Sequence, residues 1–586
     1  MKRIDIAGRQ FYWEDCGAAL SGIDGKEAEG RLNLRLHLVF PGKTGKEKGI
    51  LKFSMPALRT DGVWTACGGL NRWLTPDWGP VVLPVRSVCE YPVVSVVSFD
   101  DRNVLTVSCA DTRCTLRAGY REEKSELVFE AVWEAEFSGA EESFYTELFL
   151  DFREIHFSGC VRSAADLLRG KYGLTPAPVA AFAPVFSTWY CFHQELNREK
   201  LLDECRAAKS LGLETVILDD GWETEDTGRG FGYTGDYLPA EKKVGNICTL
   251  TAELRELGLK SMIWFSLAFA GDFSQSTEKY KGRSLYHDDV QHAYVVDPRF
   301  PEVRAHIVGY CTKAVRDWGF DGLKLDFIDS FRTDNKELRD GMDCGSLEEG
   351  IKRLTDSLKT ALRAIRDDVL IEFRQRYVGP VMQRLGNMFR VGDCPGSLLQ
   401  NRVSSIDLRL IAGENAVHSD PLEWNEGESP EVIATYLIHT IFSVLQYSVF
   451  PSGLTDAQRA VSANYIRFMK EYEDILLHGT LEPSGVLYNY LSCKAANDRG
   501  SVVALYAPVS TTLRERLVVL LNGSLTDGIV VDPDGKEYRY SIVDCFGNIV
   551  SEGRVCALAK LIVPIGGRVL FEQKREKENS RQFLRR

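Results

Sequence analysis

The 586-residue sequence lacks features that mark several classes of protein. No apolar run reaches the roughly 18 residues of a membrane span, and no apolar segment follows the basic residues near the start. The fifteen cysteines form no CxxC pair and no Cys/His cluster, which argues against a zinc site or a disulfide framework. A net charge of −12 disfavours general binding to nucleic acid or to an anionic membrane. We therefore expect a cytoplasmic protein with reduced thiols.

The composition changes along the chain and predicts more than one domain. "RLNLRLHLVF" alternates leucine with polar residues, as a half-buried strand does. Beyond about residue 485, turn dipeptides such as Asn522-Gly523 and Asp534-Gly535 separate short apolar runs. The predicted organisation is an N-terminal β-sandwich (1–178), a barrel (179–484), a C-terminal antiparallel β-sandwich domain (485–575) and a basic tail (576–586).

The middle segment repeats a strand, loop and helix rhythm about eight times. Ile351, Leu354, Leu358 and Leu362 share one helical face, and the capping pattern Ser346 to Glu349 opens that helix. Such repetition over about 300 residues favours a (β/α)8 TIM barrel, with a doubly wound parallel sheet as the alternative.

Charged residues interrupt the apolar strands where the strands end. In a barrel, these ends and the loops after them build the active site. Each residue alone could cap a helix or form an ion pair, but their recurrence at one end of the barrel indicates a site. In strand order, they are Asp219, Asp220 and Trp222 in the second unit, Trp264 in the third, Lys324 and Asp326 in the fourth, Arg374 and Arg376 in the fifth, Arg390 and Asp393 in the sixth, and His418 and Asp420 in a weakly strand-like seventh.

This mixture of carboxylates, donors and aromatic rings suits a sugar. Sugar hydroxyls need charged hydrogen-bond partners, and the apolar ring face needs an aromatic surface. Glycoside cleavage usually uses one ionised and one protonated carboxyl group. Asp326 is the candidate for the ionised group, since Lys324 lies on the same strand face and would favour its charged form. Asp393 is the candidate for the acid.

At "VILDDGWE", "KLDF" and "RVGDCPGSLLQNR" the chain resembles the α-galactosidase (melibiase) group, glycoside hydrolase family 36 and its clan relatives. The resemblance implies a retaining α-glycosidase that needs no metal or other cofactor. By position, it makes Asp326 the nucleophile and Asp393 the acid/base. It also implies a substrate-binding set of Asp219, Asp220, Trp222, Lys324, Trp189, Tyr190, Trp264 and Arg390, with Trp64 or Trp73 either reaching over the pocket or lying in the core.

The chain departs from the family pattern after the fifth strand. "EFRQRYVGP" brings Glu372, Arg374 and Arg376 where the better-known α-galactosidases carry a Cys- and Gly-rich segment. The two arginines either pair with Glu372 and the aspartates, which we favour, or bind an anionic group on the substrate. The acid/base segment also differs from the usual form. Galactose specificity is therefore inferred from the family alone.

Other functions use the same residues. An α-glycosidase for N-acetylgalactosaminides or for an anionic sugar is one alternative. The four aspartates could instead hold a divalent cation, with Lys324 as the base of a metal-assisted lyase or isomerase. A carbohydrate-binding protein without chemistry is a third. The expected partner is an oligosaccharide or glycoside, with no nucleic acid or membrane, and self-association is left open because no surface stripe specifies an interface.

Overall fold

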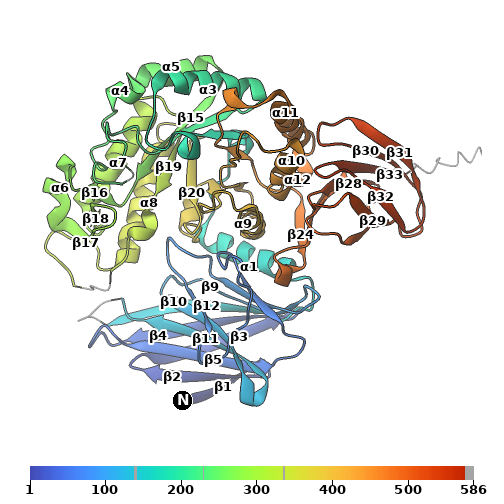
Figure 1. Cartoon of the computed structure of the whole chain (residues 1–586). Helices are drawn as coiled ribbons and strands as arrows, with labels where there is room; N and C mark the ends of the chain where they lie inside the picture. The colour runs from blue at the N-terminus through green and yellow to red at the C-terminus, as the bar shows by residue number, and fades with distance from the viewer. Residues whose placement is uncertain (137–140, 229, 334–336, 574–586) are drawn as a thin grey trace, which may run out of the picture. The chain divides into compact units, whose positions relative to one another are not determined.

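The computed structural model describes residues 1–136, 141–228, 230–333 and 337–573 (Figure 1). The chain divides into two compact units. The first contains Met1–Trp424, Phe442–Gly453 and Gly485–Asn489, and the second contains Asn425–Ile441, Leu454–Ser484 and the chain from Tyr490 onward. The basic tail expected at 576–586 lies outside the described residues.

Two six-stranded sheets form the N-terminal part of the first unit. One has the order β1-β2-β5-β11-β10-β7, and its strands are β1 (Lys2–Ile6), β2 (Arg9–Cys16), β5 (Lys48–Pro56), β11 (Glu126–Glu134), β10 (Cys114–Arg121) and β7 (Val81–Pro84). The other has the order β3-β4-β12-β9-β8-β6, and its strands are β3 (Ala19–Ala28), β4 (Arg31–Phe40), β12 (Glu142–Asp151), β9 (Asn103–Cys109), β8 (Val93–Val97) and β6 (Gly62–Thr65).

The side-chain alternation of β4 explains why these sheets pack face to face. Its four leucines, Leu32 to Leu38, are buried at every second position, and the residues between them are more exposed. They join one apolar cluster with Phe53 and Phe129 of the other sheet. Burial of both inner faces produces a sandwich, as the sequence predicts. Helix α1 (Phe157–Tyr172) follows the last strand.

Eight parallel strands form the barrel of the first unit. The sheet order follows the chain, and isolated parallel bridges join the two ends at His418–Val444 and Leu422–Tyr447. The TIM-barrel prediction is confirmed. The strands are β13 (Val185–Ser187), β14 (Thr215–Leu218), β15 (Lys260–Ser266), β19 (Gly322–Asp326), β20 (Leu370–Arg374), β21 (Met388–Arg390), β22 (Ala416–His418) and β23 (Gln446–Tyr447).

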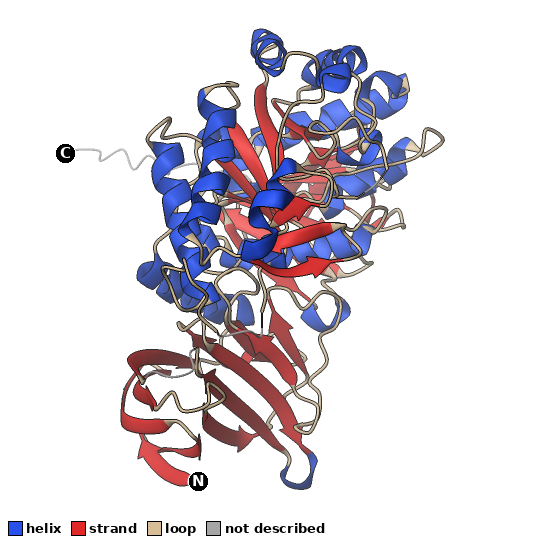
Figure 2. Cartoon of the chain, turned by 90° about the vertical axis from the view of Figure 1, so that its left-hand side faces the viewer, coloured by secondary structure: helices blue, strands red, loops and turns tan. Residues whose placement is uncertain are grey.

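Helices flank the barrel strands in Figure 2. Helix α8 begins as predicted, with the Ser346 hydroxyl accepting from the Glu349 amide, and α7 has Pro301 in its first turn. An excursion after β15 adds the small sheet β16-β18-β17, which the sequence analysis did not anticipate. The helices of the first unit after α1 are α2 (Trp189–Phe192), α3 (Arg198–Leu211), α4 (Glu241–Val244), α5 (Ile247–Glu256), α6 (Gln275–Tyr280), α7 (Pro301–Arg316), α8 (Leu347–Arg363) and α9 (Leu398–Ile411), and the excursion strands are β16 (Phe269–Gly271), β17 (Ser284–Asp288) and β18 (Ala293–Val296).

The amino ends of the strands enclose an apolar layer. Ile217, Met262, Leu370 and Met388 meet there, and Ala181 of the segment before β13 packs among them. Ala177, Ala180 and Phe182 of the same segment pack against this cluster and close this end of the barrel. The charged residues Asp326, Arg374 and Arg390 lie at the opposite end, because each is the last residue of its strand.

The second unit contains three helices and a β domain: α10 (Pro430–His439), α11 (Asp456–Glu471) and α12 (Glu473–Leu476) accompany a seven-stranded and a three-stranded sheet. Most neighbouring strands are antiparallel, as predicted, but β26 pairs with β28 and β27 with β29 in parallel. The strands are β24 (Thr480–Ser484), β25 (Ser492–Asn497), β26 (Gly500–Leu505), β27 (Ser510–Thr512), β28 (Leu517–Asn522), β29 (Gly528–Asp532), β30 (Tyr538–Val543), β31 (Ile549–Val555), β32 (Ala559–Ile562) and β33 (Arg568–Gln573).

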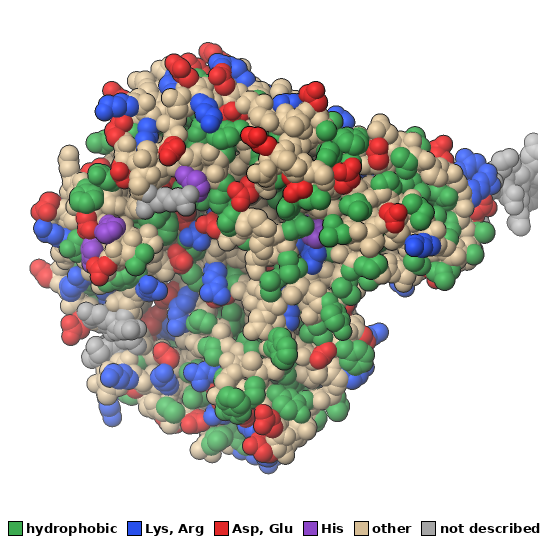
Figure 3. Space-filling model, in the orientation of Figure 1, with side chains coloured by type: hydrophobic (Ala, Val, Ile, Leu, Met, Phe, Trp, Pro, Cys, Tyr) green, Lys and Arg blue, Asp and Glu red, His purple; other side chains and the backbone are tan. Residues whose placement is uncertain are grey.

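Two general features complete the fold. Acidic and basic side chains are interspersed over the face shown in Figure 3. Among the described helices, none is long and apolar enough to cross a membrane. The proposed domain boundaries at 178/179 and 484/485 remain a prediction.

Candidate active site

Asp326, the last residue of β19, lies at the centre of the polar end of the barrel. Its Oδ1 accepts hydrogen bonds from Arg374 Nε (2.8 Å), the Tyr377 hydroxyl (2.9 Å) and the Phe327 amide (2.8 Å). Its Oδ2 accepts one from Trp264 Nε1 (3.1 Å). The two carboxylate oxygens are therefore unequal: Oδ1 has three donors and Oδ2 has one among the described residues.

Asp326 is held in its charged form. Burial alone would raise its pKa, but the charges of Arg374 and then Lys324, together with these hydrogen bonds, hold the pKa well below its ordinary value. Lys324 favours this charged form, as the sequence predicts, although no ion pair between its Nζ and Asp326 is found among the described residues. Its Nζ donates to Asp219 Oδ2 at 2.6 Å, and both side chains are buried. Arg374 is the cation in contact with Asp326, while Lys324 acts at longer range.

Arg390, at the end of β21, connects the sixth and seventh strands. Its Nη2 donates to Asp393 Oδ1 (2.8 Å), its Nη1 donates to Asp420 Oδ1, and its Nε lies 3.7 Å from Glu372 Oε1. Arg390 is buried, whereas the Asp393 side chain is 45% exposed. Burial would raise the pKa of Asp393, but Arg390, and after it Arg374 and Lys324, hold it below the ordinary value. The described site thus places Asp393 at an accessible edge, in its charged form.

Asp220 and Glu223 form a second pair of carboxyl groups in the site. Asp220 Oδ2 accepts from Gln194 Nε2 at 2.7 Å. Burial raises the pKa of Asp220 to about 6, and burial followed by the charge of Asp220 raises that of Glu223 well above its usual range. Lys243 lies nearby, with Nζ donating to the carbonyls of Gln194 (2.7 Å) and Asp226 (2.6 Å). Two neighbouring buried carboxyl groups with raised pKa values are expected to share a proton.

The aromatic residues do not all line the site. Trp189 and Tyr190 are half-buried, and the Tyr190 hydroxyl donates to Asp420 Oδ2 (2.9 Å). Trp264 is almost fully buried and acts on Asp326 through its indole N–H. The expected substrate contact of Trp222 disagrees with the structure: its ring has no exposed surface, packs against Phe265, and donates from Nε1 to the Trp264 carbonyl (2.9 Å).

The two tryptophans of the sandwich domain have different positions. Trp64 is fully buried and donates from Nε1 to Asp407 of α9 at 2.8 Å, so it has the core role that was one of its two expectations. Trp73 is 79% exposed. A contact between Trp73 and the substrate stays a prediction.

The two arginines of the fifth segment also separate. Arg374 pairs with Asp326, whereas Arg376 is 62% exposed and pairs with Glu90 of the sandwich domain at 3.1 Å. Glu372 pairs with neither. Its Oε2 accepts from Gln446 Nε2 at 2.6 Å, and its other oxygen faces Arg390. Both arginines thus form ion pairs within the protein. Arg374 pairs with an aspartate, whereas Arg376 pairs with Glu90, which the strand positions did not predict.

Four contributing residues escaped the sequence analysis: Tyr377, Gln194, Glu223 and Lys243. Tyr377 and Glu223 stand inside the quoted segments "EFRQRYVGP" and "VILDDGWE", so their nearness to Arg374 and Asp220 was the available signal. Gln194 follows the first strand after a short helix, and Lys243 lies on α4. No periodic pattern points to either of these two.

His418 is buried against the Ala181 carbonyl (2.8 Å), and burial lowers its pKa to about 4, so it is a neutral structural residue.

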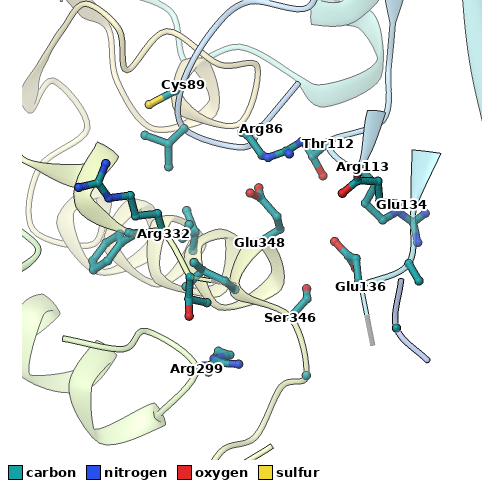
Figure 4. A pocket seen from close by; sticks show the side chains of 18 of the residues that line it. Arg86, Cys89, Thr112, Arg113, Glu134, Glu136, Arg299, Arg332, Ser346 and Glu348 are labelled. Atoms are coloured by element: carbon teal, nitrogen blue, oxygen red, sulfur yellow. The ribbon is translucent and has the colours of Figure 1, made fainter. Parts of the chain in front are cut away.

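A separate cavity of about 880 Å³ opens beside the start of α8 (Figure 4). Its lining is highly charged, and Figure 4 shows Glu136, Glu348, Arg86 and Arg332 around it. Asp326 and Asp393 are not among the residues that line it, although Asp329 is. Among the described residues that line this cavity, Phe331 is the one aromatic side chain, which does not match the lining expected for a sugar ring.

Comparison with solved structures identifies the architecture. An α-galactosidase from Lactobacillus brevis superposes with a TM-score of 0.64 at 13% identity, covering 98% of this chain and 83% of that one. The family 36 α-galactosidase AgaA from Geobacillus stearothermophilus superposes with a TM-score of 0.62 at 15% identity, covering 98% and 89%. The chain has the fold of glycoside hydrolase family 36.

Sequence comparison supports the family 36 resemblance over shorter stretches. The G. stearothermophilus α-galactosidase AgaA is 32% identical over 123 residues, 20% of this chain and 16% of that protein. An A type blood α-D-galactosamine galactosaminidase from Flavonifractor plautii is 26% identical over 145 residues, 22% of this chain and 12% of that protein. The matches thus span less than a fifth of these curated relatives. No family model matches the chain.

Proposed function

We propose that this protein is a retaining α-glycoside hydrolase, most similar in action to the α-galactosidases, that releases a terminal α-linked sugar from an oligosaccharide or glycoside. The observation that carries the proposal is Asp326. It is a buried carboxylate at a barrel strand end, kept ionised by the charges of Arg374 and Lys324 and by four hydrogen-bond donors. The relatives support the substrate class, since an AgaA variant with the same fold was solved in complex with raffinose.

In the proposed first step, Asp326 attacks the anomeric carbon and displaces the aglycone. Oδ2 is the attacking oxygen, because it accepts one hydrogen bond where Oδ1 accepts three. The carbon–aglycone bond breaks as the carbon–Oδ2 bond forms, and Asp393 transfers its proton to the leaving oxygen. In the second step, water attacks the same carbon, Asp393 takes the proton of that water, and Asp326 is released. Two inversions retain the α configuration.

The proposal requires Asp393 to gain a proton before the first step. Its pKa is low in the free protein because the charges of Arg390, Arg374 and Lys324 outweigh the effect of burial, although its side chain stays 45% exposed. A bound substrate would cover this side chain and displace water, and desolvation raises a carboxyl pKa. We therefore place the protonation of Asp393 in the substrate complex. A separation of roughly 5 to 5.5 Å between the two carboxyl groups is part of the same proposal.

A panel of nitrophenyl α-glycosides tests this function. It includes the galactoside, N-acetylgalactosaminide, glucoside, xyloside and galacturonide, each with wild type, Asp326→Ala and Asp326→Asn. Release of nitrophenol from one α-glycoside by wild type alone, with the α anomer of the sugar appearing first by NMR, is the expected result. First appearance of the β anomer, or full activity of both variants, would contradict it.

The metal-assisted alternative is tested separately, by assaying the same panel with and without EDTA. No group of three or more His, Cys, Asp or Glu side chains suited to a metal ion is found within the described residues. Asp219, one of the supposed ligands, is instead paired with Lys324. Activity that survives EDTA is expected. Activity that disappears with EDTA and returns with a divalent cation would favour the lyase or isomerase function.

A further inference from the structure

The guanidinium of Arg374 presents one unused edge at the site. Its Nε donates to Asp326 Oδ1, and the side chain is 19% exposed. Within the described residues, neither Nη1 nor Nη2 donates a hydrogen bond. Both atoms keep some contact with solvent. The planar group lies over the Tyr377 ring (4.9 Å to the ring centre) and near that of Phe327 (5.5 Å). The aromatic rings and Asp326 therefore fix the orientation of a fork whose outer edge stays accessible.

The neighbouring cations are already paired with carboxylates. Lys324 is paired with Asp219, and Arg390 with Asp393 and Asp420. Arg374 differs because one nitrogen is used and two are available. An arginine edge with two parallel N–H groups matches the two oxygens of a carboxylate or a sulfate.

We infer that Arg374 binds an acidic group carried by the sugar that is cleaved, so that the preferred substrates are α-glycosides of an anionic sugar. This inference rests on the proposed function. The acidic group belongs to the sugar rather than to the aglycone, because Arg374 is bonded to the carboxylate that attacks the anomeric carbon. The chemistry fits a sugar carboxylate, as in a uronic acid, and equally a sugar sulfate ester.

An anion on Arg374 would also prepare Asp393. The charges that face Asp393 are Arg390, Arg374 and Lys324, which favour its ionised form, and Asp326, which opposes it. Neutralising Arg374 removes one of the three cations, so Asp393 takes up its proton more easily when an anionic sugar is bound. The neutral sugar lacks this effect. Substrate charge would thus improve both binding and the acid step.

The decisive experiment compares three substrates that differ at C6: nitrophenyl α-D-galactoside, α-D-galacturonide and 6-sulfo-α-D-galactoside. Wild type is expected to favour one or both anionic substrates in kcat/KM by about 10- to 100-fold, the size of a charge-assisted hydrogen-bonded pair. The galacturonide and the sulfate arms separate the two sources of the charge.

Arg374→Lys, which keeps the charge but loses the planar pair of N–H groups, should retain only part of the preference. Arg374→Gln should abolish it. Arg316→Gln, at an exposed position on α7, is the matched control for loss of an arginine charge.

A binding measurement keeps the inference testable whatever the turnover. Calorimetric titration of Asp326→Ala with D-galacturonate, D-galactose 6-sulfate and D-galactose is expected to show tighter binding of an anionic sugar, and this difference should vanish in Asp326→Ala/Arg374→Gln. Equal or tighter binding of neutral galactose, or cleavage of the neutral galactoside at least as fast as both anionic substrates, would overturn the inference and leave the glycosidase proposal intact. Cleavage that survives in Asp326→Ala would overturn the proposed function instead.

Discussion

Lys324 Nζ, on the fourth barrel strand, donates a 2.6 Å hydrogen bond to Oδ2 of Asp219, which follows the second strand. Both partners are buried, with side chains 6% and 2% exposed. The pair joins the second and fourth strands below the proposed nucleophile. It fixes the position of Lys324, whose charge then acts on Asp326 at a distance.

Removal of one partner of this pair should destabilise the protein. Lys324→Met leaves the Asp219 carboxylate buried without its cation, and we expect the free energy of unfolding to fall by roughly 3 to 5 kcal/mol. Urea denaturation followed by tryptophan fluorescence measures the change. The double variant Lys324→Met/Asp219→Asn should recover part of the loss, because no uncompensated charge remains. A single variant as stable as wild type would show that the pair has no structural role.

The Asp220 and Glu223 pair predicts a specific pH dependence of stability. Both pKa values are raised in the folded state, so the folded protein holds more protons than the unfolded chain between about pH 4 and 6. Stability from this pair is fully present below the unfolded pKa values and is lost as the pH rises through the folded ones. Glu223→Gln should reduce that loss by up to about 1.4 kcal/mol per pH unit for each proton removed. Urea denaturation between pH 4.5 and 7.5 checks it, and identical slopes for the variant and wild type would contradict the shared proton.

Tyr377 should contribute to catalysis through Asp326. Tyr377→Phe keeps the ring over which Arg374 lies but removes one of three donors to Oδ1. We expect kcat/KM to fall about 10-fold, the effect of one hydrogen bond to a charged group, with little change in melting temperature. Tyr145→Phe, at an exposed position in the sandwich, is the control. An unchanged kcat/KM would mean that the remaining donors alone define the nucleophile.

Asp393 should show the behaviour of an acid/base. Asp393→Ala is expected to lower kcat by about 10² to 10⁴ for methyl glycosides, whose leaving oxygen needs a proton. A dinitrophenyl glycoside needs no protonation, so its first step should be nearly unaffected. Added azide should then restore turnover and give the α-glycosyl azide. Equal losses for both leaving groups, without azide rescue, would assign the acid role to another residue.

The sequence predicted the barrel well because its signals are local. Alternation in β4 and the cap at Ser346 each depend on residues close together in the chain. Asp326 could be chosen because burying a charged residue at the end of an apolar strand costs free energy unless the charge is paired or used. The seventh strand, β22, is only three residues long, which explains its weak pattern.

The partners of the charged residues could not be predicted in the same way. Strand periodicity predicts on which face of the sheet the side chains of Lys324, Glu372 and Arg374 lie. Which carboxylate oxygen each side chain reaches depends on the register between strands and on the side-chain rotamers. Trp222 illustrates the same limit, since its ring is fully buried although it lies two residues after the polar pair Asp219 and Asp220. Cytoplasmic location stays a prediction, and self-association stays open.

Trapping of the glycosyl intermediate tests the central claim most directly. Wild type is incubated with a 2-deoxy-2-fluoro or 5-fluoro α-glycosyl fluoride of the sugar that the panel identifies, digested, and analysed by tandem mass spectrometry. The account predicts a single glycosyl adduct on Asp326, within the peptide that contains "LKLDFID", and none in Asp326→Asn. An adduct on another carboxylate, or turnover with inversion and no adduct, would contradict it.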